Sequence, residues 1–178
     1  MIAALCLLLL QTRTDADKAI AAYEKAVKSA KDTSGRAAAV GNLGGVLHPD
    51  LRDRLIDLAA NPAPEIRAAA VNLLGGYRND EKAADAIDRL IADRDTTVAV
   101  RACQALGELE HGLARKRVEK LNKRFLDKDE AVAKASVEAA GVVRAKESID
   151  PLIDAGKLVA QKLAGIFQQM GIEGCNGG

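Results

Sequence analysis

Aromatic residues are scarce in this chain of 178 residues, and tryptophan is absent. The aromatic side chains are Tyr23, Tyr77, Phe125 and Phe167. The core must therefore consist of aliphatic residues and alanine, which suits closely spaced helices. With no tryptophan, and with Phe125 on a predicted buried stripe, the sequence offers no aromatic platform for stacking single-stranded nucleic acid.

Cysteine and histidine are also few, and their spacing excludes the common disulfide and metal arrangements. The three cysteines, Cys6, Cys103 and Cys175, lack Cys-x-x-Cys spacing, and their odd number argues against a disulfide framework. Neither His48 nor His111 has a second histidine or a cysteine four residues away, so no zinc pattern exists. We therefore expect no bound metal and no cofactor.

Neither sign of charge dominates, because 26 lysines and arginines face 25 acidic residues. This balance gives no overall attraction to nucleic acid or to an anionic membrane. Hydrophobic residues make up 48% of the chain, which excludes a disordered polymer. Only four prolines are present, and alanine, leucine, lysine, aspartate and glutamate are abundant, so the composition favours helix over strand.

The chain begins with ten apolar residues, "MIAALCLLLL". This run is too short to cross a bilayer, which takes about 20 residues, and it resembles the apolar region of a secretory signal. No lysine or arginine precedes it, and no clear cleavage site follows. We predict a signal segment over 1–12 and export to the periplasm or cell envelope, with no membrane span in the mature chain. The alternative is a buried first helix in a cytoplasmic protein.

One helical pattern recurs at nearly constant spacing, and "PEIRAAAVNLLGGY" over 64–77 is its clearest copy. The four copies are 33–46, 64–77, 97–109 and 130–143, and the glycines that follow their apolar cores are Gly44, Gly75, Gly107 and Gly141. These glycines are 31, 32 and 34 residues apart. In the 64–77 copy the apolar residues follow offsets of three and four, from Ile66 to Tyr77. They therefore share one face of an α-helix.

A second set of amphipathic helices alternates with these copies. Each ends in a short break, at 61–64, 93–96 or 127–130, where aspartate, asparagine and proline terminate one helix and cap the next. Pro64 falls where a first-turn proline is tolerated. The unit is therefore a helix A, a tight turn and a helix B. A period of 31–34 residues with two helices per period predicts a helical solenoid.

The flanks extend this pattern. Residues 15–31 form an amphipathic segment that serves as helix A of the first pair. A fifth helix A starts at 148–154, and its apolar positions continue toward Met170. The glycine-rich residues 171–178 are typical of the start of a linker and favour a chain that is a fragment of something longer. We predict an all-α, right-handed solenoid of four to five helix pairs over 13–170, with its clearest repeats over 49–144.

The valine or isoleucine positions, the small-residue core, the Leu-Gly pair and the Asp/Pro turn resemble short HEAT-like repeats of the phycobilisome-lyase type, which are common in bacterial scaffold proteins. The first copy departs from this pattern at Gly35 and Asn42, which replace apolar residues. The resemblance implies a non-catalytic scaffold that binds a protein or peptide on a concave face lined by helices B. An accessory factor of the bilin-lyase kind is a further alternative.

Polar residues recur on the outward side of the helices B. They lie three residues, or seven to eight residues, before the glycine of each copy. The apolar stripe turns inward, so these positions should point away from the core and form a ladder along the concave face. The predicted partner-binding residues are Arg36, Arg67, Asn72, Gln104, Lys134 and Glu138. Ordinary solvation of the helices is the alternative.

Two motifs suggest chemistry, but simpler explanations account for them. Cys103 could be a nucleophile or a bilin-attachment site. The equivalent positions of the other copies hold valine, at Val40, Val71 and Val137. Cys103 is therefore predicted to be a small packed hydrophobe. The pair Glu110-His111 resembles one element of HEAT-like di-iron hydroxylases, which need several such pairs. We predict no di-iron centre and no enzyme, with His111 in a turn at Gly112.

The segment "RKRVEKLNKR" over 115–124 carries six cationic residues and one acid, Glu119. HEAT-like DNA glycosylases bind the duplex backbone with similar surfaces. Binding of nucleic acid phosphates through this helix is therefore an alternative function. The solvated outer face of a helix A is the simpler interpretation, and we do not expect nucleic acid to be the partner.

Overall fold

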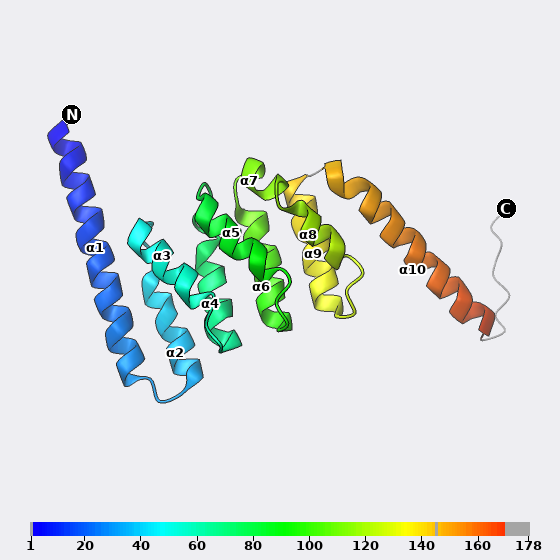
Figure 1. The fold of residues 1–178 in the computed structure, drawn as a ribbon, viewed down its shortest axis with the longest axis horizontal. Helices are drawn as coiled ribbons and strands as arrows, with labels where there is room; N and C mark the ends of the chain where they lie inside the picture. The colour runs from blue at the N-terminus through cyan, green and yellow to red at the C-terminus, as the bar shows by residue number, and fades with distance from the viewer. Residues whose placement is uncertain (1, 145, 170–178) are drawn as a thin grey trace.

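The protein is an all-α solenoid in a computed structural model that describes residues 2–144 and 146–169, with side chains over 11–144 and 146–162 (Figure 1). The helices are α1 (Ile2–Ser29), α2 (Thr33–Val40), α3 (Pro49–Leu58), α4 (Pro64–Leu74), α5 (Glu81–Leu90), α6 (Thr96–Glu108), α7 (His111–Arg115), α8 (Val118–Arg124), α9 (Glu130–Val143) and α10 (Ile149–Gln169), with two 3-10 turns, η1 (Gly41–Leu43) and η2 (Lys146–Ser148). The predicted fold class is confirmed.

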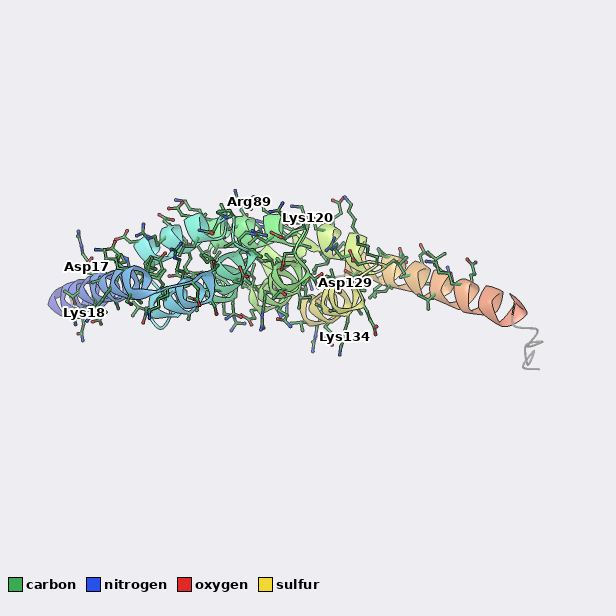
Figure 2. The ribbon with its side chains drawn as sticks, turned by 90° about the horizontal axis from the view of Figure 1, so that it is seen from below. Asp17, Lys18, Arg89, Lys120, Asp129 and Lys134 are labelled. Atoms are coloured by element: carbon green, nitrogen blue, oxygen red, sulfur yellow. The ribbon has the colours of Figure 1, made fainter. Side chains whose placement is uncertain are left out.

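The helices form two layers. Helices α1, α3, α5 and the α7–α8 pair make the first layer, and α2, α4, α6 and α9 make the second. Figure 2 separates the layers, because Arg89 and Lys120 project from one side and Lys134 from the other. Four helix pairs are thus complete. Helix α10 begins a fifth and extends away from the stack (Figure 1).

The turns between helices are built as the sequence predicts. Side-chain oxygens of aspartates cap helices in both layers, including Asp80 on the amide of Ala83 at 3.0 Å and Asp95 on that of Val98 at 3.1 Å. Pro64 lies in the first turn of α4, where its missing N–H has no helical partner to lose. These caps fix where the capped helices begin, and so they fix the register of the surface positions on those helices.

The core is aliphatic. Leucine and isoleucine side chains such as Leu55, Leu74 and Ile87 are fully buried between the layers. Within the second layer, small residues bring neighbouring helices close together. A methyl group added to Gly75 would lie 3.3 Å from Ala105 Cβ, and the same group on Gly107 would lie 3.6 Å from the Cα of Ala139. Gly75 and Gly107 therefore serve as points of close helix approach, whereas a methyl group added to Gly141 would meet no atom within 4 Å.

The first layer is more open than the second. A groove of about 600 Å³ runs between α3 and α5, and its lining includes Asp53, Ile56 and Arg89. The second layer, α2, α4, α6 and α9, is the more closely packed of the two.

Three local features differ from the sequence prediction. Helix α1 is continuous from Ile2, so the apolar run and the segment over 15–31 share one helix. Helix α2 gives way to η1 because glycines follow it, and Gly45 has a φ of 91°. The predicted helix around 115–124 is split into α7 and α8. Leu126, next to the buried Phe125, is 45% exposed because the chain has already left α8.

The predicted glycine-rich tail, 171–178, lies outside the described residues. Within the described part of the chain, no helix combines the length and the apolar character that a membrane crossing requires.

Candidate binding surfaces

Three of the predicted ladder residues form an exposed row on the second layer. Asn72 on α4, Gln104 on α6 and Glu138 on α9 occupy equivalent positions, and all are exposed. Arg101 donates a 3.2 Å hydrogen bond to the Gln104 amide oxygen and adds a cation beside the row. This row presents mixed hydrogen-bonding groups on successive helices of the second layer.

Arg67 departs from the prediction, because it is buried and not part of the exposed row. Its guanidinium donates two hydrogen bonds to the Asp93 carboxylate, at 2.9 and 2.8 Å. It also donates to the backbone carbonyls of Asn61 and Pro62, at 2.9 and 3.0 Å. The prediction was wrong about where this side chain points. Arg67 reaches the turns between helices and links residues 61–64 to residues 93–96.

The electrostatics of this pair follow from its burial. Burial alone would raise the pKa of Asp93. The hydrogen bonds from Arg67 and from the amide of Asp95, the latter at 2.9 Å, outweigh burial and lower the pKa. The carboxylate is therefore ionised at neutral pH. The sequence signal for this contact was Asp93 itself, in the break between helices that follows the one at 61–64. Helical periodicity alone does not indicate which side chains reach from one such break to the next.

Arg36, the first predicted ladder residue, is exposed and borders a hollow of about 420 Å³. The hollow lies at the turn edge of the stack, between α1, α2 and the start of α4. Its apolar lining includes Tyr23, Val27, Leu58 and Ile66. An apolar hollow with a cation at its rim can hold a large apolar side chain next to an acidic one. The sequence did not reveal this hollow, because its walls come from four separate segments.

Lys134 is exposed but has a different setting from the other ladder residues. In the three preceding repeats its equivalents are Ala37, Ala68 and Val100, which are half-buried against the core. Helix α9 is the last of its layer, so Lys134 faces the uncovered end of the layer. Its ammonium lies 3.9 Å from a Glu138 carboxylate oxygen.

The basic segment 115–124 is already engaged with other parts of the protein. Arg117 is buried and lies 2.9 Å from Glu81 and 2.6 Å from Asp85, and Lys120 lies 2.6 Å from Asp88. The remaining contacts are Lys123–Glu119 at 2.7 Å, Arg124–Asp127 at 3.0 Å, Lys116–Glu81 at 3.9 Å and Arg115 to the Arg144 carbonyl at 3.5 Å. These contacts link α8 to α5 and offset much of the segment's positive charge.

The groove between α3 and α5 has an acidic lining that sequence reading did not single out. Its carboxylates come from both helices, at Asp53, Asp57, Asp85 and Asp88, with Lys82 and Arg89 among them. Several of these acids already pair with cations, as Asp53 does with Arg52 at 2.7 Å. Over the part of the chain that the structure describes, no three His, Cys, Asp or Glu side chains are grouped to hold a metal ion.

Cys103 is fully buried, as its repeat position predicts. Burial raises its pKa to about 11, so the thiol stays protonated at neutral pH and is a poor nucleophile. The equivalence with the other copies is incomplete, because Val137 is 38% exposed at the uncovered end of the layer. His111 is exposed and begins α7, immediately before Gly112.

A comparison with protein-family models agrees with this architecture. A family model described as HEAT repeats matches residues 20–91. A crystal structure of an engineered protein is similar to the chain with 21% identity and a TM-score of 0.49, over 75% of this chain and 68% of that one. No curated protein matches the chain. The family match over residues 20–91 and the helix pairs stacked in two layers show that this chain contains HEAT-like repeats.

Proposed function

We propose that this protein is a non-catalytic scaffold that binds a protein or peptide segment along its second layer. The observation that carries the proposal is the hollow at Arg36, at the turn edge of the stack; the exposed residues Asn72, Gln104 and Glu138 on the second layer support it. A hollow supplies an anchor for one side chain, and the row supplies hydrogen bonds for the segment that follows it. Arg67 is left out because its donors are already satisfied.

The chemistry of the partner follows from the anchor. Tyr23, Val27 and Ile66 would surround an aliphatic or aromatic side chain, and Arg36 at the rim would pair with a carboxylate. The exposed row is polar and contains Glu138, so the rest of the segment should carry polar or basic groups. We therefore expect a segment with an acidic residue beside a large apolar one, followed by polar residues.

A library of random linear peptides, panned against the purified protein, tests this directly. The selected peptides should contain an acidic residue next to a large apolar residue. The double variant Arg36→Glu/Glu138→Lys leaves the net charge unchanged, and it should weaken their binding by about tenfold or more, since a charge-assisted hydrogen bond contributes about 1.5–3 kcal/mol. The melting temperature should change little, because surface substitutions usually alter stability by no more than about 0.5 kcal/mol.

The matched control lies on the other layer. Exchanging the exposed pair on α8, by Glu119→Lys/Lys123→Glu, also preserves net charge and should leave peptide binding unchanged. Loss of binding in this control, with normal binding by the Arg36/Glu138 variant, would move the site to the first layer.

Phosphate binding through 115–124 is the second candidate from the sequence, but the ion pairs of Arg117 and Lys120 with α5 weigh against it. An electrophoretic binding assay with duplex DNA at two salt concentrations distinguishes it from the scaffold. Backbone binding would retard the DNA and weaken steeply with salt, whereas the scaffold should cause no retardation. A role as a bilin-lyase accessory factor would instead predict pigment binding on co-expression with bilin.

Export to the periplasm or cell envelope is a further part of the proposal. It rests on the apolar residues 1–10 and on their resemblance to a signal segment. N-terminal sequencing of envelope fractions from the native host should find a chain that lacks these residues. Recovery of intact Met1 from the cytoplasm would contradict export.

A further inference from the structure

One side-chain position recurs in the turns that precede α4, α6 and α9, fourteen residues before Gly75 and eleven or more before the end of each helix B. It holds Asn61, Asp93 and Asp127. In each turn the side-chain oxygen accepts a hydrogen bond from the backbone amide two residues further on, at 3.0, 2.9 and 2.9 Å. The turn therefore needs an acceptor at this position, but it does not need a charge.

In two of the three turns the residue at this position is charged and holds an arginine. Asp93 accepts two hydrogen bonds from Arg67, at 2.9 and 2.8 Å, and Asp127 pairs with Arg124 at 3.0 Å. Asn61 is uncharged, so it cannot form such an ion pair. The first of the three turns therefore lacks the carboxylate that the other two have.

Arg36 is the arginine that the missing carboxylate would hold. It lies eight residues before Gly44, as Arg67 lies eight residues before Gly75. Arg36 and Asn61 line the same hollow. Arg67 is buried in its ion pair, whereas Arg36 is exposed, and its guanidinium makes no hydrogen bond or ion pair with the described residues. The hollow thus contains a cation whose donors are unused.

Asparagine at position 61 also reverses the polarity of the site. Its side-chain oxygen is occupied by the amide of Ala63, and its side-chain NH₂ group donates to no residue that the structure describes. Asp93, at the equivalent position, can only accept hydrogen bonds. The first turn therefore offers donors from two side chains where the next turn has a donor and an acceptor already paired.

We propose that the hollow at Arg36 binds an acidic side chain of the partner segment, which takes the place that Asp93 takes beside Arg67. Arg36 and the amide of Asn61 donate to this carboxylate, and Asn61 keeps the place vacant because it carries no charge of its own. This inference rests on the proposed function and adds to it the residue that makes the hollow specific for an acid.

The lining of the hollow favours a carboxylate over a phosphate group. Arg36 is the only charged residue among the described residues that line it. One guanidinium balances one carboxylate, whereas a phosphate group carries a charge of about −1.5 to −2 and would keep an unbalanced charge beside apolar walls. Tyr23, Val27 and Ile66 form part of those walls and can contact the carbon atoms of the bound segment.

A peptide-binding measurement tests the role of Asn61. The probe is a peptide selected by panning, amidated at its C-terminus so that only side-chain carboxylates remain. Asn61→Asp keeps the oxygen that the turn requires but places a carboxylate beside Arg36. It should weaken binding by about tenfold or more, the loss of one charge-assisted hydrogen bond. The matched control is Asn79→Asp, the same change at an exposed residue in the turn before α5, which should bind as the parent does.

Changing the acidic residue of the peptide to its amide should remove the difference between the parent and Asn61→Asp. The outcomes separate this inference from the proposed function. If Arg36→Glu/Glu138→Lys weakens binding and Asn61→Asp does not, the inference is overturned and the proposed function stands. Binding that neither variant weakens would contradict both.

A titration that needs no peptide tests whether Arg36 reaches position 61. In Asn61→Asp, the introduced carboxyl group, followed by NMR, should have a pKa below the usual value of about 3.9. Arg67 is also near, because it donates to the carbonyl of Asn61 at 2.9 Å. The comparison is therefore with Arg36→Ala/Asn61→Asp, in which the pKa should rise toward the usual value. The same pKa with and without Arg36 would overturn the proposal.

Discussion

Replacing Leu74 by alanine is expected to lower the free energy of unfolding by about 3 kcal/mol, within a range of about 2–5 kcal/mol for buried leucines. Leu74 is fully buried at the C-terminal end of α4, between the two layers. The loss has two parts, the transfer of the missing methyl groups and the cavity left behind. The close helix packing of the second layer limits how far the neighbours can move to fill that cavity.

Chemical denaturation followed by circular dichroism measures this change through the shift of the unfolding midpoint. Leu47→Ala is the matched control, because Leu47 lies on the turn before α3 and is 67% exposed. That variant should change stability by no more than about 0.5 kcal/mol. Equal effects of the two substitutions would mean that Leu74 does not pack between the layers as the structure has it.

Leu74 also shows what the sequence could predict. Helical periodicity placed it on the buried stripe from Ile66 to Tyr77, and the repetition of that stripe predicted the fold. The turns were predictable for a similar reason, because the chemistry of capping is local and Asp80 and Asp95 cap helices within their own segments. The helices and their caps depend on a few neighbouring residues, and the pattern recurs along the chain. They could therefore be predicted directly from the sequence.

The candidate surface was less predictable, because it depends on contacts between units. Asn72 and Gln104 are exposed as expected, since position on the helix alone decides their exposure. Arg67 is not exposed, because its long side chain reaches the next turn and pairs there with Asp93. The hollow at Arg36 has the same origin, since four segments far apart in sequence form its walls. A periodic pattern carries no information on such contacts.

Replacing Arg67 by alanine is expected to destabilise the protein by about 3 kcal/mol at neutral pH, the lower end of the range for breaking a buried ion pair. Both side chains are 9% exposed, so Asp93 would remain as a buried charge that has lost its guanidinium partner. We expect a destabilisation at the lower end of this range because the amide of Asp95 still donates a hydrogen bond to the Asp93 carboxylate. Arg101→Ala is the control, since Arg101 is exposed on α6 and should be nearly neutral.

The dependence on pH separates this mechanism from a simple loss of packing. The pKa of Asp93 is lowered in the folded protein, so its stabilisation is present above the unfolded value of about 3.9 and is lost as pH falls through the folded value. The difference in stability between the parent and Arg67→Ala should therefore be full at neutral pH and shrink below about pH 4, as the carboxyl group becomes protonated. Denaturant titrations across this pH range measure the difference.

The double variant Arg67→Ala/Asp93→Asn gives an independent check. Asparagine keeps an oxygen that can accept from the amide of Asp95, but it carries no charge to leave buried. It should therefore recover part of the stability that Arg67→Ala loses at neutral pH, because the unpaired carboxylate is the main cost. Two results together would contradict this mechanism: a double variant less stable than Arg67→Ala alone, and a loss of stability in Arg67→Ala that does not change with pH. Arg67 would then stabilise the protein through its packing and through its hydrogen bonds with the carbonyls of Asn61 and Pro62.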